Sequence, residues 1–191
     1  MKYTEILNLA EKAIAEERIA ELLSLCEILI DSEDESVRPS GYMLKGIAYE
    51  IGGDGVDQDL EKAVGYYRQA VYLQPNAMTY VFMARASMKK GADSFASALH
   101  YLKEAEKLSY VPELDIAFGM CYENQPEQDL GLAKKHYLKA ALHGRFHGFF
   151  GYSSVCKKTG QYGRALLADS VRIVIGPILF LLLGKKASSG I

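Results

Sequence analysis

The sequence predicts an all-α protein built from helix pairs, and two observations lead to this fold class. The first is an internal repeat, because DLEKAVGYYRQAV at residues 59–71 is followed by SFASALHYLKEAE at residues 94–106 and by DLGLAKKHYLKAA at residues 129–141. The second is the spacing within each copy, where small and aromatic residues recur every three or four positions and so share one helical face. A repeat of this length with such a helix is typical of an α-helical array.

The repeated positions also predict how the helices pack. A polar residue opens each copy and is a candidate helix N-cap. Small residues let a neighbouring helix approach closely, and the large residue between them fills the space between helices. The N-cap candidates are Asp59, Ser94 and Asp129; the small residues are Ala63, Ala98 and Ala133 with Ala70, Ala105 and Ala140; the large residues are Tyr67, Leu102 and Tyr137.

Composition limits the class of protein. The chain has 191 residues, of which 49% are hydrophobic and 24% charged, so it can bury a sizeable core and is not globally disordered. Its net charge of −2 gives no general electrostatic reason to expect a nucleic-acid partner. Cys26, Cys121 and Cys156 form no CxxC pair and lie in apolar helical stretches, which predicts buried, reduced thiols. The N-terminal residues lack the features of a secretory signal, so we expect a cytoplasmic protein.

The helix pairs are expected in order along the chain. Residues 3–29 form a helical hairpin, which is a degenerate repeat or a cap, since the end of an array has a single neighbour. The first clear repeat covers residues 40–74, with its two helices separated by GGDG at residues 52–55 and its end marked by Pro75.

The other repeats follow the same order of leading helix, break and second helix. Their leading helices are expected at residues 77–90, 114–122 and 147–158. The second helices are expected to end at Leu108 and Gly144, and the last to begin near Tyr162. The predicted domains are an N-terminal helical hairpin at residues 1–38, a repeat array at 39–170, and an apolar C-terminal segment with a basic tail at 171–191.

The stretch GIAYEIGGDGVDQDLEKAVGYYRQAV, residues 46–71, resembles a Sel-one-like repeat, a relative of the tetratricopeptide repeat. The second and fourth repeats resemble the tetratricopeptide form more closely. The resemblance covers residues 40–167 and implies a right-handed α-α superhelix, or solenoid, of about four helix-turn-helix repeats. It also implies a non-catalytic scaffold or adaptor. The matching residues are Gly46, Tyr49, Gly53, Gly55, Val56, Asp59, Lys62, Ala63, Tyr66, Tyr67 and Ala70, then Gly119, Tyr122, Asp129, Ala133, Tyr137, Ala140, Ala141 and Gly144.

The leading helices of stacked pairs line the inner wall of such an array. Their side chains that face away from the partner helix mix methionine and aromatic residues with charges, which suits a groove for an amphipathic or extended protein segment. The alternative is that the apolar members fill the core. The candidate groove residues are Met43, Ile47, Glu50, Arg85, Met88, Lys89, Ile116, Met120, Glu123, Phe150, Ser154 and Lys157.

No motif of an enzyme is present. His143 and His147 are four residues apart, but Gly144 lies between them and no nearby Cys or acidic residue completes a metal-ligand set. The Gly53-Asp-Gly55 turn follows a helix rather than a strand and lacks the lysine and hydroxyl of a phosphate-binding loop. We therefore expect no catalytic residue, no metal and no cofactor, and a protein or peptide as partner.

The apolar run IVIGPILFLLLG, from Ile173 to Gly184, allows three interpretations. Its twelve residues reach roughly 18 Å as a helix, well short of the ~30 Å hydrocarbon layer of a membrane. Gly176 and Pro177 are expected to interrupt a helix there. We expect the run to cap the last repeat, with a partner-docking strip and an interfacial membrane anchor as alternatives. The side chains expected to be buried are Ile178, Leu179, Phe180, Leu182 and Leu183.

These observations favour an adaptor or scaffold that binds a protein or peptide in the concave face of the array. Two other functions agree with the same sequence. One is a membrane-associated assembly factor tethered by the apolar C-terminal segment, and the other is a secretion-type chaperone for a protein client.

Overall fold

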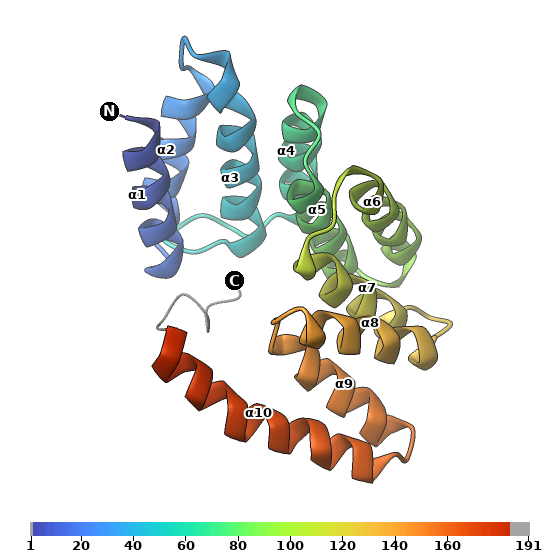
Figure 1. Cartoon of the computed structure of the whole chain (residues 1–191). Coiled ribbons are helices and arrows are strands. Elements are labelled where there is room, and N and C mark those ends of the chain that lie inside the picture. The colour runs from blue at the N-terminus through green and yellow to red at the C-terminus, as the bar shows by residue number, and fades with distance from the viewer. Residues whose placement is uncertain (1, 184–191) are drawn as a thin grey trace. The chain divides into compact units, whose positions relative to one another are not determined.

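The computed structural model describes the backbone of residues 2–183 and the side chains of residues 2–174. Over this range the chain is all-α, as the internal repeat predicts, with ten α-helices packed in sequential pairs (Figure 1). The chain divides into two compact units, unit 1 at Met1–Ser109 and unit 2 at Tyr110–Ile191. This division falls inside the stretch that the sequence analysis treats as one array.

Unit 1 contains three helix pairs. The N-terminal hairpin is formed by α1 and α2, and each of the two following pairs consists of a leading helix, a break and a second helix, as predicted. Short 3-10 turns at Glu35–Val37 and Ala92–Ser94 precede α3 and α6. The helices are α1 (Tyr3–Ala15), α2 (Ile19–Ile30), α3 (Arg38–Ile51), α4 (Leu60–Leu73), α5 (Ala77–Lys90) and α6 (Phe95–Leu108).

Unit 2 contains two helix pairs, α7 with α8 and α9 with α10. The leading helices begin at Pro112 and His147, and residues 125–129 form the break between α7 and α8. Neighbouring helices along the chain pack against each other, and α7 also contacts α9. The helices are α7 (Pro112–Asn124), α8 (Leu130–Leu142), α9 (His147–Lys158) and α10 (Tyr162–Leu183).

Side-chain caps fix where several helices begin. Asp59 accepts a hydrogen bond from the backbone N–H of Lys62 at 2.9 Å, and Asp129 accepts one from Leu132 at 2.9 Å. Both caps are confirmed predictions. Ser94 is not a cap, because it belongs to the 3-10 turn before α6 and has helical backbone angles (φ −96°, ψ −4°), whereas a capping residue is normally extended.

The repeated small residues lie at the helix interfaces, as predicted. Ala63, Ala98 and Ala133 are all fully buried. The large repeat residue Tyr67 is also fully buried, and a Cβ added to Gly46 of α3 would lie 2.5 Å from its ring. A Cβ added to Gly119 of α7 would lie 2.7 Å from the ring of Tyr137, and one added to Gly151 of α9 would lie closer still. Glycine is therefore required where a tyrosine of the second helix contacts a leading helix.

The C-terminal helix α10 differs from its prediction. Its backbone continues without interruption from Tyr162 to Leu183, through Gly176 and Pro177, and it extends past the shorter α9 (Figure 1). Proline removes one backbone hydrogen bond and crowds the carbonyl group four residues earlier, which can kink a helix without ending it. The predicted burial of Ile178, Leu179, Phe180, Leu182 and Leu183 concerns side chains outside the described residues. In the described part of the chain, no helix has the length and apolar character needed to cross a membrane.

Candidate protein-interaction surface

A buried glutamate joins the two leading helices of unit 1. Glu50, near the end of α3, is 3% exposed. Its carboxylate accepts hydrogen bonds from the Tyr67 hydroxyl of α4 and from the Lys89 ammonium of α5, each at 2.8 Å. Arg85 of α5 lies 3.6 Å from the same carboxylate. We call these four residues the Glu50 cluster.

Unit 2 has an equivalent cluster. Glu123 of α7 is 7% exposed and accepts a hydrogen bond from the Tyr137 hydroxyl of α8 at 2.8 Å. Lys158 of α9 donates to it at 2.7 Å, and Ser154 donates at 3.4 Å. In both clusters a leading helix supplies the carboxylate, its partner helix supplies a tyrosine, and the next leading helix supplies the cation. We call these residues the Glu123 cluster.

The tyrosines of both clusters remain protonated and act as donors. Burial, together with the adjacent carboxylate, raises the pKa of Tyr67 far above its usual value, and burial followed by the hydrogen bond to Glu123 does the same for Tyr137. A buried carboxylate without such partners would be strongly destabilising. The clusters therefore make each glutamate part of the packing between successive helix pairs.

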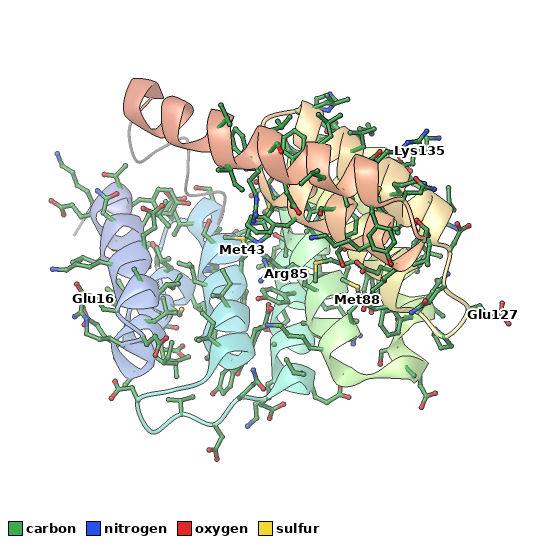
Figure 2. All side chains as sticks on the ribbon, turned by 90° about the horizontal axis from the view of Figure 1, so that it is seen from below. Glu16, Met43, Arg85, Met88, Glu127 and Lys135 are labelled. Atoms are coloured by element: carbon green, nitrogen blue, oxygen red, sulfur yellow. The ribbon has the colours of Figure 1, made fainter. Side chains whose placement is uncertain are left out.

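The predicted groove residues of unit 1 lie on the neighbouring helices α3 and α5, and Figure 2 labels three of them. Met43 and Ile47 are half-buried and pack against the apolar cluster around Tyr67. Arg85, Met88 and Lys89 keep part of their surface open to solvent. Glu50 is different, because it is buried and bound to the partner helix rather than turned away from it. We call the five remaining residues, Met43, Ile47, Arg85, Met88 and Lys89, the α3–α5 face.

The predicted groove residues of unit 2 also divide into residues that are partly exposed and residues that belong to the buried cluster. Met120 and Phe150 are 38% and 50% exposed, and Ile116 is half-buried. Glu123 is buried in its cluster, where Ser154 joins it.

Lys157 does not face α7, as a groove residue would. It forms an ion pair at 2.9 Å with Asp169 of α10, its partner helix. Its neighbour Lys158 is the residue that reaches Glu123, and the sequence analysis missed it. Aligning Gly91 with Gly160, which end the two leading helices, places Lys158 opposite Lys89 and would have identified it. The sequence also indicates that Glu50 and Glu123 occupy equivalent positions, because GIAYE at residues 46–50 recurs as GMCYE at residues 119–123.

The three cysteine side chains lie in the packed interior of the protein. Cys26, Cys121 and Cys156 are buried, and burial raises the pKa of Cys26 to about 12 and that of Cys121 to about 11. Among the residues with described side chains, no group of three His, Cys, Asp or Glu residues is placed to hold a metal ion. The partly exposed methionines, cations and Phe150 on the leading helices are suited to contact with another polypeptide.

The fold and these clusters define a tetratricopeptide-like helical repeat array. No protein-family model and no curated protein matches the sequence. Solved structures do match. BtubC (BKLC) from P. vanneervenii aligns with a TM-score of 0.69 and 18% identity, covering 91% of this chain and 80% of that protein.

Two structures of MamA are also similar, each with a TM-score of 0.61. The first shares 15% identity and covers 83% of this chain and 89% of MamA; the second shares 14% and covers 89% and 93%. At such identities the similarity concerns the fold alone. It supports a helical repeat protein and does not distinguish the Sel-one-like form from the tetratricopeptide form.

Proposed function

We propose that the chain is a non-catalytic adaptor that binds an acidic, partly apolar segment of another protein on the leading helices α3 and α5 of unit 1. Arrays of this fold typically mediate contacts between proteins. The observation that carries the proposal is the charge of the α3–α5 face. Arg85 and Lys89 share the buried carboxylate of Glu50, so among the residues with described side chains this face has one positive charge more than it has carboxylates, beside Met43, Ile47 and Met88.

The α7–α9 side of unit 2 offers apolar contact area beside a cation. Glu123 is paired with Lys158, whereas Lys157 and Arg172 share the carboxylate of Asp169. The Arg172 guanidinium lies 3.8 Å from the centre of the Phe150 ring. Met120 and Phe150 remain exposed, and methionine and aromatic side chains are enriched at protein interfaces. The proposal therefore concerns the α3–α5 face of unit 1, where the partly exposed cations Arg85 and Lys89 stand beside Met43, Ile47 and Met88.

The test is affinity capture with the full chain and a variant that changes the α3–α5 face without breaking the Glu50–Lys89 pair. Arg85→Gln with Met88→Ser removes one charge and one apolar contact. We expect the captured protein to be lost while the far-UV circular dichroism spectrum stays the same. The matched control is Lys135→Gln with Leu142→Ser on α8, which makes equivalent changes at exposed positions.

A single partner should then be purified and titrated against the three proteins by calorimetry. Loss of one ion pair and one apolar contact predicts weakening by about ten- to a hundredfold. Equal affinity for the parent and the Arg85/Met88 variant would place the interaction elsewhere. Equal loss in both variants would indicate a general effect on the fold.

A further inference from the structure

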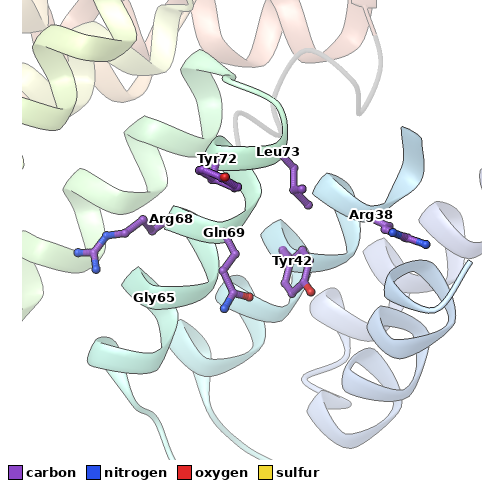
Figure 3. A pocket seen from close by; sticks show the side chains of 7 residues that line it. All are labelled: Arg38, Tyr42, Gly65, Arg68, Gln69, Tyr72 and Leu73. Carbon is purple, nitrogen blue, oxygen red and sulfur yellow. The ribbon is translucent and has the colours of Figure 1, made fainter. Parts of the chain in front are cut away.

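A second surface in unit 1 lies on the outward side of α3 and α4. It is a hollow of about 570 Å³, and Figure 3 shows Tyr42 and Gln69 facing each other across it, with Arg68 and Arg38 on opposite sides. Gly65 leaves the hollow open, because nothing lies within 4 Å of the place where its Cβ would be. We call this the outer hollow; it is lined by Arg38, Tyr42, Gly65, Arg68, Gln69, Tyr72 and Leu73.

The equivalent place in unit 2 is filled by the chain itself. The Tyr110 hydroxyl donates a hydrogen bond to Asp115 at 2.8 Å. The ring of Tyr110 lies under the Lys139 ammonium at 4.7 Å and contacts the ring of His143 at 5.1 Å. An aromatic side chain is thus held between a leading helix and its partner by one hydrogen bond, one cation and one ring contact.

The repeat shows that the two places correspond. Aligning Gly46 with Gly119 places Tyr42 opposite Asp115, and aligning Tyr67 with Tyr137 places Gln69 opposite Lys139 and Leu73 opposite His143. By the alignment of Gly46 with Gly119, Tyr110 corresponds to Val37, which is buried and has no ring to extend over the hollow. Tyr72 beside it is 88% exposed. Unit 1 therefore leaves open the place that Tyr110 occupies in unit 2, and Tyr42, Gln69 and Leu73 line it instead of the aspartate, the lysine and the histidine.

The side chains around the outer hollow indicate which chemistry would fill it. Tyr42 and Tyr72 offer aromatic surfaces, and Gln69 offers both a donor and an acceptor. Arg38 is already paired with Glu35 at 3.0 Å. Arg68, by contrast, forms no ion pair with any residue in the described part of the chain. An exposed guanidinium beside an aromatic site is suited to bind a carboxylate in two-pronged geometry.

We propose that the outer hollow binds a segment of a partner protein in which an aromatic side chain stands next to a carboxylate. The ring occupies the position that Tyr110 takes in unit 2, and the carboxylate pairs with Arg68. This site is separate from the α3–α5 face, so neither proposal depends on the other.

The test uses the full-length chain labelled with nitrogen-15 and a blocked peptide, acetyl-Asp-Tyr-Glu-Glu-amide. We expect saturable chemical-shift changes at the backbone amides of Gly65, Gln69 and Tyr72, with a dissociation constant on the order of 1 mM. Two comparison peptides, in which alanine replaces the tyrosine or lysines replace the acids, should bind at least about fivefold more weakly. Absence of saturable shifts up to about 10 mM of the first peptide would overturn the proposal.

Two variants with matched controls locate the binding. Gly65→Leu fills the hollow from within, and it should fold because the site has open space and leucine favours helix more than glycine does. Arg68→Glu reverses the charge. Each should weaken peptide binding by about tenfold. The controls are Gly163→Leu, at an open glycine of α10, and Lys135→Glu, at an exposed lysine of α8; both should bind like the parent.

Unchanged binding by Gly65→Leu and Arg68→Glu would refute the assignment, as would equal binding of all three peptides. Sedimentation equilibrium without peptide adds a further check. A dimer that Gly65→Leu abolishes would mean that the hollow receives a second copy of this chain, which would also overturn the proposal. The Arg85/Met88 variant should bind the peptide normally, which separates failure of this site from failure of the α3–α5 face.

Discussion

Replacing Glu50 by glutamine tests whether its carboxylate holds successive helix pairs together. The change keeps the size of the side chain and an acceptor for the Tyr67 hydroxyl, which lies 2.8 Å from the carboxylate. It removes the charge that binds Lys89 at 2.8 Å and Arg85 at 3.6 Å. A hydrogen bond to a charged group contributes about 1.5–3 kcal/mol. Lys89 and Arg85 are 45% and 42% exposed, so water screens part of this interaction.

We therefore expect Glu50→Gln to lower the free energy of unfolding by about 2 kcal/mol. With an m-value of about 2 kcal/mol/M, the urea midpoint should fall by about 1 M. The assay is urea unfolding followed by far-UV circular dichroism, with hydrogen exchange on peptides from residues 38–90 to locate the change. Glu61→Gln is the control, because Glu61 is 76% exposed and pairs only at the surface with Lys90. Equal midpoints for the two variants would refute the structural role of Glu50.

Three further predictions concern unit 2 and the cysteines. Gly119→Ala places a Cβ 2.7 Å from the Tyr137 ring and should cost about 1–3 kcal/mol in thermal or urea unfolding, whereas Gly163→Ala, at an open position, should cost nothing. Burial raises the pKa of Asp115, but hydrogen bonds from His136, Tyr110 and Lys139 outweigh it and lower the pKa below 3.8. The stabilisation from Asp115 is therefore present above pH 4 or so and lost as the pH falls through the lowered pKa, so the stability gap between the parent and Asp115→Asn should shrink in acid titrations. Cys26, Cys121 and Cys156 are buried, so a thiol reagent should react slowly with the native chain and rapidly in urea; fast reaction of the native chain would contradict the packing.

The helices could be predicted from the sequence because their ends carry local signals. Gly91 and Gly160 end leading helices, and Asp59 and Asp129 cap second helices. Such signals depend on a few neighbouring residues, so they can be recognised from the sequence alone. Ser94 shows the limit, because the 3-10 turn that removes its capping role is not marked by any single residue.

The positions of the candidate site residues depend more on distances between helices. Helical spacing alone places Glu50 and Glu123 on an outward face, yet each carboxylate is reached by a tyrosine from the partner helix. That contact requires the close approach that Gly46 and Gly119 permit, which is a property of the packed pair. The outer hollow could not be predicted for the same reason, since it exists only where Tyr42 and Gln69 face each other across two helices.

The Glu50 cluster also affects how binding experiments on the α3–α5 face must be designed. Lys89 is exposed enough to meet a partner, but it also compensates a carboxylate that is 3% exposed. Reversing both Arg85 and Lys89 to glutamate would place three carboxylates together, and leaving a buried charge unpaired costs several kcal/mol. Loss of binding in that variant would then report loss of packing as well as loss of recognition. Arg85→Gln avoids this problem, because the 2.8 Å contact from Lys89 still compensates Glu50. Any loss of affinity in Arg85→Gln at unchanged stability therefore measures the contribution of the exposed cation to recognition.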